Sequence, residues 1–150
     1  MKQFLFIALI SLIIWSANGQ SIDKYTLGSP LEECQDTIQI HVAGFSGILQ
    51  VFTLDDGRIY MISFTPNKSL FNYQLNSIVN YVDRRNQVVL MEGFNEVGEI
   101  ARYYSDEGDI VIWVDYNECR EKPYQIEIGM IDRELLALYE EEQSRQESNL

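Results

Sequence analysis

Histidine and cysteine are scarce in this sequence, and their scarcity restricts the chemistry it can support. There is one histidine, His41, and there are two cysteines, Cys34 and Cys119. Zinc sites use about four ligands of these types and carboxylates, and a Ser-His-Asp triad would have to use His41. The signature motifs of serine hydrolases, zinc proteases, phosphate loops and dinucleotide folds do not occur. The sequence therefore predicts no metal and no cofactor, and it favours a non-catalytic protein.

Basic residues are also few. Eleven Lys and Arg stand against 23 Asp and Glu, which gives a net charge of −12 at pH 7. The electric field of a chain this acidic repels nucleic acids and anionic membrane surfaces, so neither is an expected partner. A basic protein, a cation or a neutral ligand such as a carbohydrate is compatible with it. The alternative is that the charge only keeps a secreted protein soluble and monomeric.

The long apolar run is confined to the N-terminus. Lys2 precedes the apolar run Phe4–Trp15, and small residues at 17–19 match the pattern that signal peptidases cleave, here before Gln20. The run is shorter than the roughly 20 residues of a membrane span, although an uncleaved N-terminal anchor is the alternative. We expect residues 1–19 to be a signal peptide and the mature chain to be secreted or periplasmic, without stable membrane anchoring.

The two cysteines are expected to form a Cys34–Cys119 disulfide, because paired cysteines are the rule in oxidising compartments. Closing a loop of this length stabilises a fold by about 4–5 kcal/mol in the chain-entropy model. The alternative is a nucleophilic cysteine with His41 as its base, but no family signature surrounds either thiol.

A β-hairpin is the clearest structural pattern. Two strand-like runs, 47–54 and 59–65, flank Asp56-Gly57, a pair typical of two-residue turns. The corresponding pairs are Leu54/Ile59, Phe52/Met61 and Ile48/Thr65 on one face, and Thr53/Tyr60, Val51/Ile62 and Leu49/Phe64 on the other. A three-residue loop with Gly57 in a bulge is the alternative. Because both faces are apolar, we expect the hairpin to be central in a sheet and covered on both sides, at least away from the turn.

The remaining segments predict one α+β domain over residues 20–143, followed by a frayed tail at 144–150. We expect an antiparallel sheet of about six or seven strands, two or three packed helices and one disulfide. The predicted helices are a short one from Ser29 to Thr37, one over 69–85, and a last one capped by Asp132. The other predicted strands are 38–43, 87–91, 98–104, 109–116 and 124–130, with turns at 92–95 and 105–108.

Aromatic residues gather in the second half of the chain, and we take Tyr103, Trp113 and Tyr116 as candidate ligand-binding residues. Tyrosine and tryptophan provide a large contact area with a polar tip, which suits protein or carbohydrate recognition. Ordinary packing is the alternative, because aromatic residues favour strands. The resulting hypothesis is a secreted acidic binding module for a protein or polymer ligand. Asn67-Lys68-Ser69 is also an N-glycosylation sequon in a predicted loop.

Two other functions remain open. An inhibitor of a secreted enzyme would present an acidic hairpin tip, at Asp55-Asp56 or Asp106-Glu107, to a basic cleft. A small hydrolase would use acidic residues or His41, although strand alternation predicts that His41 faces solvent. The acidic tips also contain oxygen ligands suited to Ca²⁺, but aspartate is a routine turn former and neither tip has the calcium-loop pattern.

Overall fold

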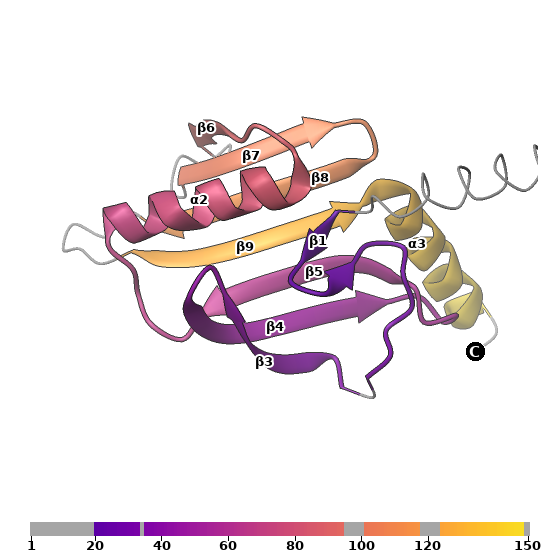
Figure 1. Cartoon of the computed structure of the whole chain (residues 1–150). Helices are drawn as coiled ribbons and strands as arrows, with labels where there is room; N and C mark the ends of the chain where they lie inside the picture. Colours follow the sequence, from indigo (N-terminus) through magenta and orange to yellow (C-terminus); the bar gives the residue numbers. More distant parts are fainter. Residues whose placement is uncertain (1–19, 34, 95–100, 118–123, 149–150) are drawn as a thin grey trace, which may run out of the picture.

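The computed structural model describes residues 20–33, 35–94, 101–117 and 124–148 (Figure 1). The predicted signal peptide and both cysteines of the predicted disulfide lie outside these residues. Within them, the fold is α+β, with a seven-stranded antiparallel sheet, a two-stranded sheet and two helices. The sequence-based prediction of an antiparallel sheet with packed helices is therefore confirmed.

The elements follow the chain in this order: β1 (Ser21–Ile22), β2 (Tyr25–Thr26), β3 (Thr37–Val42), β4 (Phe45–Thr53), β5 (Ile59–Pro66), α2 (Asn72–Asn86), β6 (Met91–Phe94), β7 (Ala101–Glu107), β8 (Ile110–Asn117), β9 (Gln125–Asp132) and α3 (Arg133–Ser148). The large sheet has the order β3-β4-β5-β9-β8-β7-β6, so β9 joins an N-terminal three-stranded half to a C-terminal half. Neither helix has the length and apolar run that a bilayer crossing requires, as far as the described residues extend.

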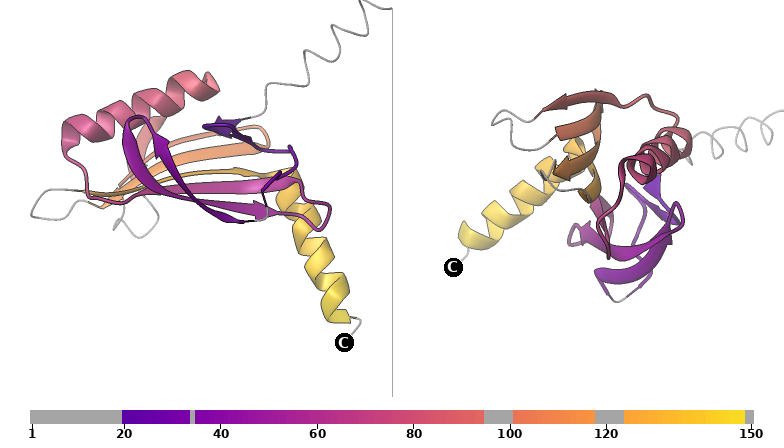
Figure 2. Two further views of the ribbon diagram at one scale, coloured as in Figure 1. Left: turned by 60° about the horizontal axis from the view of Figure 1, so that its bottom comes forward. Right: turned by 90° about the vertical axis from the view of Figure 1, so that its left-hand side faces the viewer.

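The helices lie on opposite sides of the sheet. Helix α2 runs along one face, here called the inner face, whereas α3 leaves the end of β9 on the other side, the outer face (Figure 2). The apolar stripe of α2, Leu75, Ile78 and Val82, is buried in the main core. Strand side chains that alternate toward the same core include Leu49, Val51, Ile62, Phe64, Ile112, Val114, Ile126, Ile128 and Met130. Burying such side chains is the main favourable term in folding.

Away from its turn, the β4–β5 hairpin has the predicted register. Next to the turn, the register differs from the prediction. Partners run from Gly47↔Pro66 to Phe52↔Met61 as predicted, but Thr53 pairs with Ile59. Gly57 has a φ of +86°, and its amide donates to the Leu54 carbonyl over 2.9 Å. The loop therefore has three residues with a compensating bulge, and the predicted pairs Leu54/Ile59 and Thr53/Tyr60 are wrong.

The prediction that this hairpin is covered on both sides, at least away from its turn, is also wrong for β4. Its outer-face residues Ile48 and Phe52 remain 37% and 36% exposed. Near the turn, Leu54 and Tyr60 are buried in a second cluster with Leu135 of α3. The physical reason is the direction of α3, which leaves the sheet and covers its outer face only at this end (Figure 2).

The predicted helix over 29–37 does not form in the described part of that segment. The chain instead bonds to the start of β5: the Ile59 amide donates to the Ser29 carbonyl at 2.9 Å, and the Leu31 amide donates to the Gly57 carbonyl at 3.0 Å. Pro30 also forms a bridge with Arg58. Tertiary pairing thus satisfies the backbone groups that a helix would have used, and it overrides the local capping signal.

Three boundaries differ from the prediction as well. The strand expected over 87–91 lies later, at Met91–Phe94, where the sequence predicted a turn, because those residues pair with β7. The β7–β8 hairpin turns through Gly108-Asp109 alone, since Glu107 pairs with Ile110. Asp132 caps α3 as predicted, accepting a 3.1 Å hydrogen bond from the Leu135 amide, but the helix continues to Ser148 through the expected frayed residues.

Candidate functional site

The predicted aromatic residues are divided between the two faces of the sheet. In the β7–β8 register Tyr103 lies opposite Val114, whereas Trp113 lies opposite Tyr104. Directly opposed residues in an antiparallel pair point to the same side, and neighbours along a strand alternate. Tyr103 and Tyr116 therefore share the inner face, and Trp113 belongs to the outer face. The three candidates do not form one surface.

The inner-face pair is part of the packing around the core. The Tyr103 and Tyr116 rings stack with 5.7 Å between centroids, and Tyr116 meets Tyr124 edge to face at 5.6 Å. The Tyr116 hydroxyl donates to a Glu92 carboxylate oxygen at 2.9 Å. Burial raises the pKa of Tyr103, and the nearby Glu92 carboxylate adds to that rise. Tyr116 is only 9% exposed, so this pair contributes more to stability than to an accessible surface.

Two outer-face aromatic rings, Trp113 and Tyr104, each occupy the space beside a glycine. A Cβ at Gly129 would overlap the indole of Trp113, and a Cβ at Gly93 would approach the Tyr104 ring to 2.9 Å. The absence of a side chain at each glycine leaves room for the ring above it. Both rings are half-buried. Tyr104 belongs to the aromatic cluster that the sequence shows but is not among the candidate binding residues, and neither are Gly129 and Arg102. A lone glycine inside the apolar strand β9 is the available signal for a close approach.

A partly buried ion pair flanks Trp113. The Arg102 guanidinium bonds both carboxylate oxygens of Asp115, at 2.6 and 2.8 Å, and lies 5.8 Å from the centroid of the indole. Hydrogen bonding to Asp115 raises the pKa of Arg102. A two-point pair of this kind fixes the side-chain geometry. We call Trp113, Tyr104, Arg102 and Asp115 the outer aromatic patch.

The outer face also carries exposed apolar side chains outside the outer aromatic patch. Ile48 and Phe52 lie on β4, and Met91, which is 58% exposed, lies opposite Tyr104 on β6. Among the described residues, only α3 packs on this face, and it does so at one end. An exposed apolar surface of this kind is typical of an interaction site.

His41 faces solvent, as predicted, and lies beside one hydroxyl. Its Nε2 is 2.8 Å from Oγ of Ser46, its partner across the β3–β4 pair. A nucleophile and a base at this distance are two parts of a triad. In the described part of the chain, no carboxylate bonds to His41, and no group of three metal-ligating side chains occurs.

Both acidic hairpin tips are bonded to α3. At the β4–β5 tip, the Asp55 amide donates to Glu142 at 3.1 Å and Gln146 donates to the Asp55 carboxylate at 3.2 Å. At the β7–β8 tip, Arg133 forms a 2.8 Å ion pair with Asp106. These exposed contacts join α3 to both hairpin tips, so a partner that bound a tip would compete with them.

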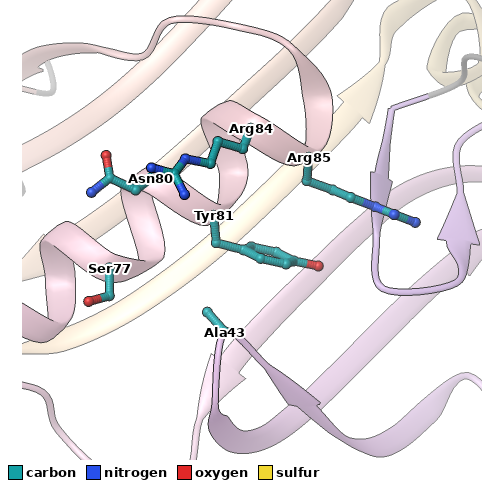
Figure 3. Close-up of a pocket in the computed structure, with 6 residues that line it drawn as sticks. All are labelled: Ala43, Ser77, Asn80, Tyr81, Arg84 and Arg85. Atoms are coloured by element: carbon teal, nitrogen blue, oxygen red, sulfur yellow. The ribbon is translucent and has the colours of Figure 1, made fainter.

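An open surface pocket of about 600 Å³ lies between α2 and the β3–β4 turn (Figure 3). Its lining consists of Ala43, Ser77, Asn80, Tyr81, Arg84 and Arg85. The Arg85 guanidinium is directed to the β1–β2 segment, donating to Oγ of Ser21 at 3.0 Å and to the Asp23 carbonyl. Arg84 occupies the last turn of α2, where cations offset the negative end of the helix dipole. Both arginines thus have a structural role at this pocket.

The predicted glycosylation site is accessible. Asn67 is exposed in the loop between β5 and α2, and its backbone amide donates to the Ser46 carbonyl at 2.9 Å. The side chain therefore projects from a backbone that the sheet holds in place.

Comparisons with protein-family models, curated proteins and solved structures give no match to this chain. A functional assignment therefore depends on the chemistry of the surfaces described above.

Proposed function

We propose that residues 20–150 form a secreted, non-catalytic binding module that holds a protein or polymer ligand on the outer face, centred on Trp113. The observation that carries the proposal is the seating of the Trp113 indole on Gly129, within a sheet face that α3 leaves largely uncovered. Of the residues the sequence suggested, Trp113 thus has the leading role, while Tyr103 and Tyr116 support the sheet from its inner face.

A ring held in this way is suited to recognition. Trp113 is held against Gly129 and beside the paired Arg102, so it loses little conformational freedom when a ligand covers it. Aromatic and arginine side chains of this kind supply most of the binding energy at interfaces. Ile48 and Phe52, on β4 of the same face, would add apolar area if a ligand extended that far across the sheet.

The charge of the chain favours one ligand chemistry. With a net charge of −12, the protein attracts a partner that carries basic side chains and repels an anionic polymer. An extended protein segment that combines apolar and basic residues therefore fits the outer face best. The inhibitor alternative has less support, because both hairpin tips are bonded to α3.

The test uses Trp113 as its own reporter, because it is the one tryptophan in residues 20–150. Purified residues 20–150 are immobilised, proteins from the native extracellular fraction are captured, and each captured protein is titrated while Trp113 emission is recorded. We expect a saturable change in emission. Trp113→Ala and Tyr104→Ala should weaken capture at least tenfold, with far-UV circular dichroism confirming their fold.

The matched control is Tyr73→Ala, which removes a 69% exposed aromatic ring from α2, away from the outer face. This variant should capture the ligand as the wild type does. Equal capture by the folded Trp113→Ala and Tyr104→Ala variants, or binding that leaves the emission unchanged, would refute the placement on the outer face.

A further inference from the structure

Strand β3 forms one edge of the large sheet and pairs only with β4 (Figure 1). The Val51 amide donates to the Asp36 carbonyl at 2.8 Å, immediately before the strand. Bonded residues alternate along an antiparallel pair, so Ile38, Ile40 and Val42 direct their backbone groups to β4. The N–H and C=O groups of Thr37, Gln39 and His41 therefore point outward, and no backbone hydrogen bond within the described residues occupies them.

Within the described residues, this edge lacks the features that normally block strand addition. Natural edge strands are protected by lysine, proline, bulges, inward-pointing charges or a very short length. The sequence of β3 is Thr-Ile-Gln-Ile-His-Val, without proline, glycine, lysine or acidic residues, and its register with β4 is unbroken from Thr37 to Val42. The edge is thus regular, uncharged when His41 is neutral, and rich in β-branched residues.

We propose that β3 pairs antiparallel with β3 of a second copy of this chain, about a two-fold axis at Gln39, so that the two sheets become one. In this register Gln39 faces Gln39 of the second copy, and Thr37 faces its His41. These are the residues whose backbone groups point outward, and each such pair exchanges two hydrogen bonds.

The side chains favour a second copy over an unrelated peptide. In the same register Ile38 faces Ile40 of the second copy on the inner face, where both are half-buried in the monomer. The outer-face pairs join polar residues to polar residues. The strand is therefore complementary to itself on both faces, which is the requirement for a two-fold interface.

The effect of salt distinguishes self-association through β3 from binding of a basic peptide at the same edge. The acidic residues Glu32, Glu33 and Asp36 precede β3, and each copy has a net charge of −12. Repulsion between two copies is screened by salt, because the Debye length falls from about 10 Å at 0.1 M to about 3 Å at 1 M. Salt therefore strengthens self-association, whereas it would weaken binding of a basic peptide.

The β3 edge is separate from the proposed ligand site around Trp113. Trp113 lies on β8, in the other half of the sheet, so loss of ligand binding and loss of dimer formation would be separate results.

The experiment is sedimentation velocity of residues 20–150 over a concentration series at about 0.1 M and about 1 M NaCl. We expect a concentration-dependent doubling of mass that increases at high salt, with slowed amide exchange at Thr37, Gln39 and His41. Gln39→Lys places a charge on the edge, and Gln39→Pro removes an outward N–H without removing a bond to β4. Both variants should remain monomeric.

The matched control is Gln50→Lys, the same substitution at an exposed outer-face position on β4, opposite Thr37. This variant should form dimers as the wild type does. A monomer at every concentration and salt, a dimer that persists in Gln39→Lys, or a dimer that salt weakens would overturn the proposal. So would a covalent dimer on a non-reducing denaturing gel, because it would assign the association to a disulfide.

Discussion

The indole of Trp113 lies across the backbone of Gly129, its directly opposed partner on β9. The glycine is buried beneath the ring, and no other residue type leaves space for it. This contact fixes the position of the outer aromatic patch.

Gly129→Ala should therefore lower the free energy of unfolding by about 1–3 kcal/mol, as expected for overpacking. The added methyl group must displace the indole, so Trp113 emission should change in the folded state as well. Urea denaturation followed by far-UV circular dichroism measures the first effect. In the Trp113→Ala background the same substitution should cost much less, and an unchanged cost would disprove the contact.

Asn86 is a buried link between α2 and β1. Its Oδ1 accepts from the Ser21 amide at 2.7 Å, and its Nδ2 donates to the Val82 carbonyl at 3.1 Å. Asn86→Ala leaves a buried amide unsatisfied and should cost about 1–3 kcal/mol in chemical denaturation. Asn80→Ala, at an exposed position of the same helix, should change stability by less than about 0.5 kcal/mol. Equal effects at the two positions would contradict this role.

Asp132 caps α3 through the Leu135 amide. Asp132→Ala should destabilise the protein by about 1 kcal/mol and accelerate amide exchange in the first turn of α3. Asp132→Asn keeps a capping oxygen and should retain most of that stability. If the two substitutions have the same effect, the cap is not the cause.

The carboxyl of Glu33 should titrate below its ordinary pKa of 4.5, because Lys24, and to a smaller extent Tyr25, donates a hydrogen bond to it. A pKa that is lower in the folded state stabilises the fold at pH values above 4.5, and this contribution disappears as the pH falls through the folded-state value. Carbon-detected NMR titration measures the pKa of the carboxyl. Lys24→Ala should raise it toward 4.5, whereas Lys68→Ala, at a distant exposed lysine, should leave it unchanged.

Local patterns predicted several elements correctly because their signals depend on short-range periodicity. Alternation along the predicted strand 124–130 puts Tyr124, Ile126, Ile128 and Met130 on one face, and all four are buried. The same alternation placed His41 toward solvent. Helical spacing predicts a core stripe of Phe71, Leu75, Ile78, Val79 and Val82. Leu75, Ile78 and Val82 are buried and Val79 is partly buried, but Phe71 precedes α2 and is exposed.

Other features depended on pairing between distant segments. The sequence around Ser29 is typical of a helix start, but Ser29 instead forms a backbone hydrogen bond with Ile59. The position of β6 depends on its pairing with β7. Strand alternation already separated Trp113 from Tyr116, but the face of Tyr103 required the register between β7 and β8.

The sequence by itself determined the class of fold, most of the apolar faces and the helix start at Asp132, because each is a property of residues close along the chain. Only the tertiary structure decided which face of the sheet stays open and which strand lies at its edge. Those two features depend on strand order and on the direction of α3, and both are set by contacts between residues far apart in the sequence.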